Sequence, residues 1–259
     1  MAQPAKKTEA RNSLPMKKIC FFGDGLAFGL GDADQGGWPN RLWRTESERV
    51  HDLQIYNLAV PTQTSADIAA RWRREAEPRL AGVARSGLVF CFGLSDMADI
   101  DDQGIRVTLF ETLAMAEKII TEAKAWRPVL WIGPAPMLRS AEPREEGGHW
   151  VAYSPARLAA LNEAFGMLAA ELGVPYLDLC AALGANRDYR RALIDGDGVH
   201  PTADGHAVVA EAVAAWSAWE DWFPRPRPVV KRDPNAFRPL EFRRVSSPQA
   251  EDMVATAIL

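Results

Sequence analysis

The sequence lacks three features that mark broad classes of protein. Its apolar runs all fall short of the roughly 18 residues that a membrane-spanning helix needs, so we expect no membrane span. Basic residues are not in excess, because the formal net charge is -4, and we therefore expect no nucleic-acid partner. The polar start, "MAQPAKKTEARNSLPMKK", lacks the apolar segment of a signal peptide.

Cysteine is scarce as well. The three cysteines, Cys20, Cys91 and Cys180, each lie in or beside an apolar run, and none has the spacing of a metal ligand. An odd number of thiols without a secretion signal is typical of a reducing compartment. We therefore expect a cytoplasmic protein with no metal site and no other cofactor.

Short apolar runs alternate with longer amphipathic stretches along the 259 residues. Such a chain holds one large α/β domain or two small ones. The expected strands span 18–22, 54–58, 88–92, 129–132 and 175–179, and the expected helices span 37–50, 65–80, 104–126, 154–172 and about 202–219. This alternation predicts a parallel sheet covered by helices on both faces, with ligands gathering at the carboxyl ends of its strands.

Local signals fix some of the helix ends. Ser154 followed by Pro155 predicts a helix start, and Gly173 predicts the corresponding stop. Thr64 or Ser65 is expected to cap the helix over 65–80.

The composition changes at the two ends of the chain. Residues 224–249 hold six prolines and seven basic residues without a clear period. We expect a disordered or extended lead-in over 1–16, one domain over 17–223, and a proline- and arginine-rich arm over 224–259. This arm is a candidate contact for a protein partner or for another copy of the chain.

The loop after the first strand reads "FFGDGLAFGLG", residues 21–31. Gly23 and Gly25 match the first half of the dinucleotide-binding pattern G-x-G-x-x-G, but Phe28 stands where close packing needs glycine or alanine. Asp24 also places a negative charge where a pyrophosphate would lie. These departures disfavour a dinucleotide site and leave a turn that serves only the backbone, or another chemistry.

Three further strand ends favour another chemistry. They read "YNLAVPTQTSADI" from Tyr56, "FGLSD" from Phe92 and "DGDGVHPTADGHAVVAEAV" from Asp195. Together with "FFGD", this order resembles the SGNH or GDSL-type hydrolase family over roughly residues 17–220. The resemblance implies a flavodoxin-like three-layer α/β/α sandwich with a central parallel five-stranded sheet.

The resemblance also implies catalytic roles. The family's nucleophilic serine falls on Gly25, its histidine base on His200, and the aspartate that orients the base on Asp197. His200 is one of only four histidines and carries a ring nitrogen of the kind that a general base requires. Asp197, three residues earlier, can reach the far ring nitrogen and fix its tautomer. His206 is expected to be structural, whereas His51 and His149 lie in polar segments without a pattern.

The remaining implied positions form the oxyanion site. Backbone N–H groups come from Gly25 and from Thr62 or Ala59, and the third contact, an asparagine in the family, falls on Ser95. Asp24 is expected to shape the loop. Thr62 stands where the family often has glycine. Three positions therefore depart from the family's pattern: Gly25, Thr62 and Ser95.

The missing serine leaves the activity open, because no acyl-enzyme forms without a nucleophile. The chain could bind an acyl or sugar ligand without cleaving it, the glycine could have been introduced to trap a substrate, or Asp197 and His200 could activate a water. In lineage we expect a carboxylic-ester hydrolase acting on a small-molecule acyl ester or an acylated sugar or natural product. The alternatives are a non-catalytic binding or scaffolding protein and an acyltransferase.

Overall fold

The computed structural model describes residues 14–101, 103–138, 143–146 and 148–224. Its central sheet has five strands in the order β2-β1-β3-β5-β8, and every neighbouring pair is parallel. The strands are β1 (Lys18–Gly23), β2 (Gln54–Asn57), β3 (Ser86–Cys91), β5 (Val129–Ile132) and β8 (Tyr176–Leu177). The parallel five-stranded sheet that the sequence predicts is therefore confirmed.

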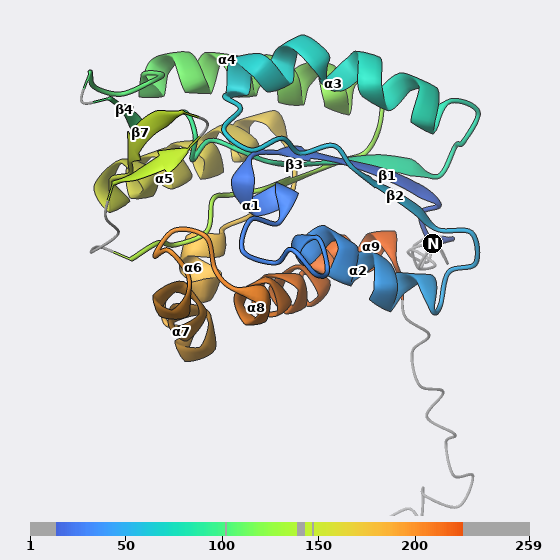
Figure 1. Ribbon diagram of the computed structural model, residues 1–259. Helices are drawn as coiled ribbons and strands as arrows, with labels where there is room; N and C mark the ends of the chain where they lie inside the picture. Colours follow the sequence, from blue (N-terminus) through green and yellow to red (C-terminus); the bar gives the residue numbers. More distant parts are fainter. Residues whose placement is uncertain (1–13, 102, 139–142, 147, 225–259) are drawn as a thin grey trace, which may run out of the picture. The chain divides into compact units, whose positions relative to one another are not determined.

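Two layers of helices cover the sheet (Figure 1). One layer contains α3 (Ser65–Leu80), α4 (Leu109–Lys124) and α5 (Pro155–Leu172). The other contains α2 (Gly37–Ser47), α6 (Leu179–Leu183), α7 (Arg187–Asp195), α8 (Ala203–Ala214) and α9 (Ser217–Trp222). The three-layer α/β/α sandwich is confirmed.

Strand β1 shows how one sequence serves both layers. Successive side chains of a strand point to opposite faces, so Ile19 and Phe21 pack with the core beneath α2 and α8. Cys20 and Phe22 pack with the core beneath α3 and α4. Because both faces are buried, the strand is apolar at almost every position.

The helix-end signals match the observed ends. Thr64 caps α3 in a reciprocal arrangement with Asp67, in which each side chain accepts from the backbone of the other residue. Ser154 caps α5, which ends at Gly173 with φ 64°. Ser65, the other candidate cap, is instead the first residue of α3.

The prediction of one continuous last helix is wrong. The span 202–219 divides into α8 and α9, with Trp216 in extended backbone between them. Trp219 and Trp222 of α9 are buried, and Trp219 Nε1 donates to the buried Glu46 of α2 at 3.2 Å. Packing of these tryptophans against the core accounts for the turn.

The helix predicted over 104–126 begins later than expected. A capping box between Thr108 and Glu111 fixes the start of α4 at Leu109. The preceding residues pair backward, with Arg106 N donating to Ala98 O at 2.8 Å and Val107 N to Asp96 O at 3.0 Å. This pairing lies beside a second sheet of order β4-β7-β6, formed by β4 (Asp99–Ile100), β6 (Arg144–Glu146) and β7 (His149–Ala152).

The described part of the domain begins before residue 17. Met16 N donates to Trp222 O at 3.0 Å, and the Met16 side chain packs against the core. Residues 1–13 of the predicted lead-in lie outside the described residues. The same holds for the arm over 224–259, except for Pro224.

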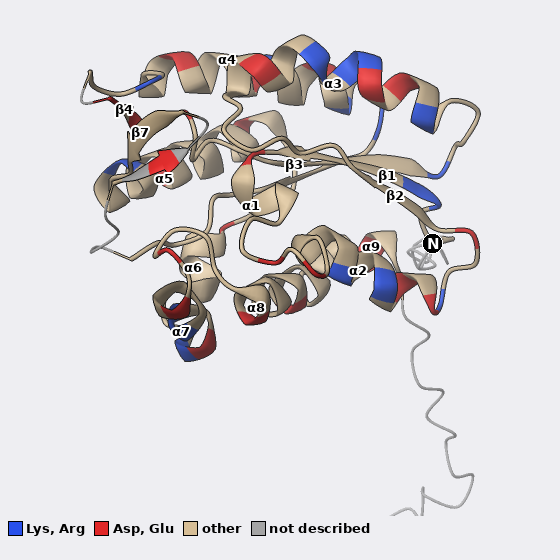
Figure 2. Ribbon diagram, viewed as in Figure 1, with Lys and Arg blue, Asp and Glu red and all other residues tan. Residues whose placement is uncertain are grey.

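The distribution of charged and apolar residues over the helices gives two further observations. Basic and acidic residues are interspersed along α3 and α7 (Figure 2). Within the described ranges, no helix has the length and apolarity to cross a bilayer.

Candidate active site

The strand order places a ligand site between the ends of β1 and β3. The chain passes from β1 to β2 on one side and then to β3 on the other, and ligands of doubly wound sheets bind where this direction reverses. A Cβ on Gly23, the last residue of β1, would lie 2.0 Å from Cys91 O. Glycine is therefore required there, because the two strand ends meet backbone to backbone.

Asp24 joins the loops that follow these two strands. Its carboxylate is buried and accepts from Leu94 N at 3.1 Å and Ser95 N at 3.3 Å. Burial raises the pKa of Asp24 to about 6, although the two N–H donors and the nearby His200 oppose that rise. The predicted loop-shaping position thus fixes the backbone of the β3 loop, and it directs the Ser95 N–H inward to the carboxylate.

Asp197 and His200 form a pair in the loop before α8. Asp197 Oδ2 lies 3.0 Å from His200 Nδ1, and Asp197 Oδ1 accepts from His200 N at 2.6 Å and Val199 N at 2.8 Å. Partial burial raises the pKa of Asp197, but these hydrogen bonds outweigh it and hold the pKa well below its usual range. An ionised Asp197 keeps the imidazole proton on Nδ1 and leaves Nε2 as an acceptor.

The acceptor nitrogen of His200 faces Gly25, the first residue of α1 (Gly25–Phe28). A Cβ on Gly25 would lie 2.7 Å from His200 Nε2 and 2.9 Å from Leu30 Cδ1. The imidazole therefore extends into the space in which a serine side chain would begin. Both of these atoms are at the ends of side chains, which can shift. The backbone of Gly25 is not in the left-handed region, so a side chain at this position would cause no backbone strain.

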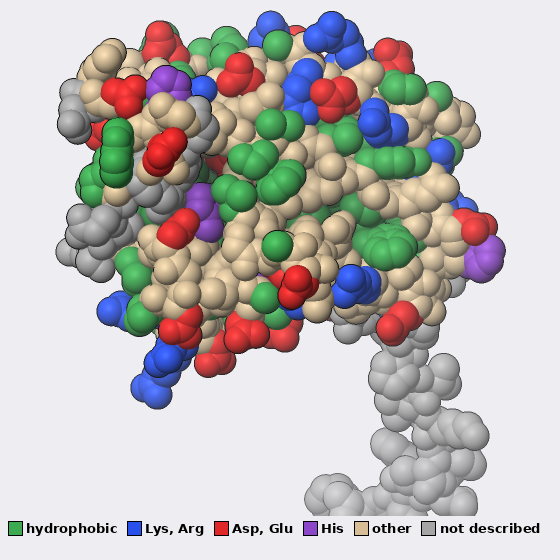
Figure 3. All heavy atoms as spheres, viewed as in Figure 1, with side chains coloured by type: hydrophobic (Ala, Val, Ile, Leu, Met, Phe, Trp, Pro, Cys, Tyr) green, Lys and Arg blue, Asp and Glu red, His purple; other side chains and the backbone are tan. Residues whose placement is uncertain are grey.

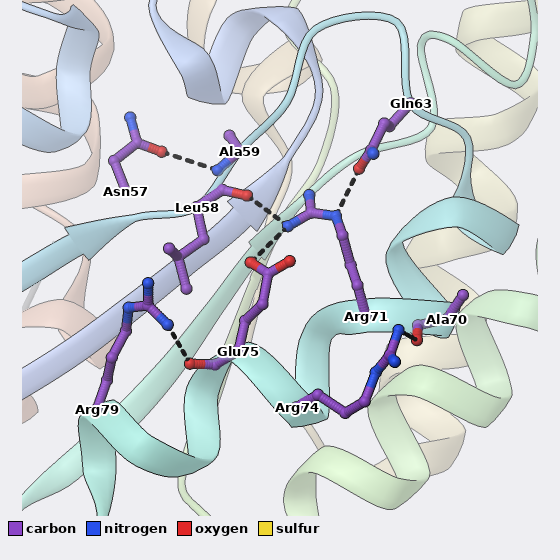
Figure 4. Close-up of polar contacts among 9 residues, drawn as sticks. All are labelled: Asn57, Leu58, Ala59, Gln63, Ala70, Arg71, Arg74, Glu75 and Arg79. Carbon is purple, nitrogen blue, oxygen red and sulfur yellow. Dashed lines mark hydrogen bonds and ion pairs between the residues drawn. The ribbon is translucent and has the colours of Figure 1, made fainter.

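The β2–α3 loop carries the other candidate oxyanion positions. Ala59 N donates to Asn57 Oδ1 at 3.2 Å, so this N–H is already engaged (Figure 4). Thr62 has φ 64°, a left-handed conformation that is costly for a β-branched residue. Its carbonyl accepts from Arg106 Nη1. The conformation explains why glycine would suit this position.

Arg71 of α3 holds the same loop from beneath. Its guanidinium donates to Leu58 O at 2.8 Å, to Gln63 Oε1 at 2.6 Å and to Glu75 Oε2 at 3.0 Å (Figure 4). Both ends of the loop are thus tied to one side chain of the adjacent helix.

A cavity of about 290 Å³ opens beside the candidate oxyanion positions. It is lined by Thr62, Ser95, Ala98, Ile100, Arg106, His149, Val151 and Tyr153. The structure thus brings Thr62 and Ser95 to one cavity, between the ends of the main strands and the second sheet.

Of the cavity residues, His149 was assigned no role from the sequence, and Arg106 was not predicted at all. His149 lies on β7, where its Nδ1 is 2.8 Å from Asp101 Oδ2, and Arg106 lies in the segment that pairs with Ala98. Their approach to Ser95 depends on pairing among strands of two to four residues. Such short segments carry too few residues for a readable period.

Two other buried polar side chains near the sheet, His206 and Asp96, have structural partners. His206 is buried and its Nε2 donates to Leu30 O at 2.8 Å, as a structural histidine would. The buried Asp96 accepts from Ser65 N at 2.9 Å and from Thr112 Oγ1 at 3.2 Å. Among the residues with described positions, no three metal-ligating side chains gather into a metal site.

Two solved structures, described as a lipase/acylhydrolase and an acetylxylan esterase, resemble this chain in fold. The lipase/acylhydrolase from Enterococcus faecalis has a TM-score of 0.61 at 19% identity, covering 76% of this chain and 93% of its own. A catalytic mutant of Axe2, an acetylxylan esterase from Geobacillus stearothermophilus, has a TM-score of 0.55 at 17% identity, covering 78% and 94%. These likenesses show the fold.

Similarity in sequence is confined to the level of the family. No curated protein sequence matches this chain significantly. Residues 21–208 match the GDSL-like lipase/acylhydrolase family, a span that begins in β1 and ends within α8 and contains both Asp24 and His200. The chain therefore belongs to the GDSL-like lipase/acylhydrolase family.

Proposed function

We propose that this chain binds a carboxylic ester in the family's site and forms no acyl-enzyme at position 25. The observation that carries the proposal is the approach of His200 Nε2 to Gly25, 2.7 Å from the position of a Cβ. A base aimed at this point has the placement of one that activates a nucleophile, but glycine offers it no hydroxyl.

The rest of the candidate site supports ester binding. The Asp197–His200 pair keeps a hydrogen-bond acceptor directed at the reaction position, with Nδ1 and Oδ2 3.0 Å apart. The Gly25 N–H lies in the first turn of α1, where backbone donors have no partner within the helix. Such a donor can hold the carbonyl oxygen of a bound ester.

An acyltransferase is disfavoured on the same ground as a hydrolase of the usual type. Transfer of an acyl group to an alcohol by this mechanism passes through the same acyl-enzyme, which position 25 cannot form. Gly25 is therefore equally unfavourable for an acyltransferase and for a hydrolase that forms an acyl-enzyme.

Slow hydrolysis by water is the second candidate. The observation that favours it is the ionised Asp197 beside His200, which prepares the ring nitrogen to accept a proton from any bound hydroxyl donor. His200 and Leu30 now extend into the space next to Gly25. A water would need one of these side chains to shift, so we expect this route to be slow.

The test compares 4-nitrophenyl butyrate hydrolysis by the unmodified chain, by Gly25→Ser, and by Gly25→Ser with His200→Ala. Loss of the serine in a related type of site costs about a millionfold in turnover. We expect Gly25→Ser to gain at least about a thousandfold, because His200 must first yield some space, and His200→Ala to abolish the gain. A Gly25→Ser chain that folds but stays at background would refute the proposal.

The unmodified chain separates the two candidates. Slow turnover that disappears in the single variant His200→Ala would establish the water route. Background turnover that His200→Ala leaves unchanged would favour ester binding alone.

A further inference from the structure

We propose that the cavity beside Thr62 and Ser95 binds a carboxylate group carried by the ester ligand, with Arg106 as its ionic contact. This inference rests on the proposed ester-binding function and adds the chemical class of the ligand. Its starting point is the composition of the cavity wall. Arg106 and His149 line the cavity, and in the part of the chain that the structure describes no acidic residue lines it.

Arg106 is held in place by one backbone and one side-chain hydrogen bond. Its backbone N–H donates to Ala98 O at 2.8 Å, which fixes its position opposite β4. Its Nη1 donates to Thr62 O, the one hydrogen bond that this side chain makes with a described residue. A guanidinium has five N–H donors, so most of them remain for a ligand.

Two acidic residues in and beside β4, Asp99 and Asp101, already have partners. Asp99 of β4 forms an ion pair with Arg157 of α5, with Nη1 and Oδ1 3.1 Å apart. Asp101 accepts from Trp150 N at 2.8 Å and lies 2.8 Å from His149 Nδ1. The charge of Arg106 also acts on the buried Asp96, where it opposes the rise in pKa that burial causes. Asp96 already accepts from Ser65 N and Thr112 Oγ1, so the N–H groups of Arg106 that Thr62 does not use can bind an anion.

His149 provides a second polar contact of defined orientation. Because Nδ1 faces the Asp101 carboxylate, the ring carries its proton there and Nε2 is an acceptor, which suits a donor group of the ligand or a bridging water and not the carboxylate itself. The hydrogen bond from His149 also lowers the pKa of Asp101. An ionised Asp101 keeps the His149 ring in one orientation at the cavity wall.

The size of the cavity favours a short ligand. Its volume of about 290 Å³ lies at the lower end of the roughly 300–1,000 Å³ typical of small-molecule sites. An extended apolar acyl chain would also need an extended apolar surface. On the face drawn in Figure 3, hydrophobic side chains lie in small groups among polar and charged ones. A half-ester of a short dicarboxylic acid fits these features.

Arg106 also connects the anion to the candidate oxyanion site. The same guanidinium that faces the cavity holds the carbonyl of Thr62, which has a positive φ. Engagement of a carboxylate by Arg106 would restrain the Thr62 backbone next to the ester carbonyl. The acidic group would thus serve as a handle that orients the ester.

The first arm of the test measures equilibrium binding to the unmodified chain by calorimetry. Monomethyl succinate and methyl butyrate have acyl parts of equal carbon number and differ in the carboxylate. We expect at least tenfold tighter binding of monomethyl succinate, weakening as salt is raised. Arg106→Gln, which retains a donor for Thr62 O, is expected to remove this preference. Arg74→Gln, an exposed arginine of α3 with one hydrogen bond to Ala70 O, is the matched control and should retain it.

The second arm uses Gly25→Ser and compares kcat/KM for 4-nitrophenyl hemisuccinate and 4-nitrophenyl butyrate. A preference for the hemisuccinate that falls at least tenfold on Arg106→Gln supports the proposal. Equal values for the two esters, or a preference that survives Arg106→Gln, overturn it while leaving the ester site intact. If Gly25→Ser hydrolyses neither ester, the proposed function fails and the binding arm alone decides the anion site.

Discussion

At the scale of single residues, the site depends on which polar groups are already engaged. The Asp24 carboxylate accepts hydrogen bonds from Leu94 N and Ser95 N, and the Asn57 side chain accepts one from Ala59 N. These bonds leave Gly25 and Thr62 as the candidate backbone donors to an ester carbonyl. The side chain of Ser95, by contrast, contributes to the cavity wall.

Because of Asp24, the unfolding free energy should depend on pH between about pH 4 and pH 6. Because burial raises its pKa to about 6, the folded chain holds this proton more tightly than the unfolded chain, whose carboxyl pKa is near 3.9. The stabilisation is complete below pH about 4 and is lost as the pH rises through about 6. Relative to the unmodified chain, Asp24→Asn should gain on the order of 2 kcal/mol in unfolding free energy between pH 4 and 8.

Urea unfolding at several pH values measures this gain. The exposed Asp34→Asn serves as the control and should differ from the unmodified chain by a constant amount. A constant difference for Asp24→Asn as well would contradict the assignment of this window to Asp24.

Thr62 should be a source of strain that glycine removes. A non-glycine residue in a sparsely populated backbone region costs about 1–3 kcal/mol, and glycine in the same place adds about 0.5–1 kcal/mol of unfolded-state entropy. Since φ is 64°, Thr62→Gly should raise the unfolding free energy by about 1 kcal/mol. Thermal unfolding measures the change. Thr62→Val keeps the β-branch and should bring no gain; equal effects of the two substitutions would exclude backbone strain.

Residue-level prediction succeeded where the partners are close in the sequence. Asp197 and His200 are three positions apart, so one tight loop suffices to pair them, and the spacing predicts this contact. The contact between Asp101 and His149 spans 48 positions and requires a strand pairing that the sequence does not signal. Arg106 was missed for the same reason.

At the scale of elements, α3 controls the loop that carries Thr62. Arg71 ties Leu58 O and Gln63 Oε1 to the helix, and its side chain is 13% exposed. Arg71→Met should lower the unfolding free energy by about 2–3 kcal/mol, because it removes charged hydrogen bonds and leaves their partners unpaired. It should also speed amide hydrogen exchange across residues 59–63.

Arg74→Met is the matched control on the same helix. Arg74 is exposed and bonds only Ala70 O among the described residues, so its loss should change stability by less than about 0.5 kcal/mol. Equal losses for the two variants would show that the Arg71 contacts do not hold the loop.

Elements were predictable where their ends carry local chemistry. Thr64 with Asp67 and Ser154 with Gly173 mark α3 and α5 in the sequence itself. The break between α8 and α9 has no such mark, since it arises from tertiary burial of Trp219 and Trp222. The short β4 lies between the predicted strand over 88–92 and the predicted helix over 104–126, where no strand was predicted.

At the scale of the whole molecule, the topology determines where chemistry can occur. The sheet order β2-β1-β3-β5-β8 brings the ends of β1 and β3 together, and the loop before α8 returns His200 to the same edge. The family match over residues 21–208 spans all of these parts. The parallel sheet covered on both faces follows from the alternating pattern, whereas the order of its strands and the wall formed by the second sheet do not.

The central claim is that position 25 lacks a nucleophile in a site otherwise able to use one. A fluorophosphonate probe tests it directly, because an activated serine oxygen displaces fluoride and forms a stable phosphonate ester. Intact-mass spectrometry should show one adduct on Gly25→Ser, none on the unmodified chain, and much slower labelling when His200→Ala is added. Labelling of the unmodified chain at another residue, or no labelling of folded Gly25→Ser, would contradict the account.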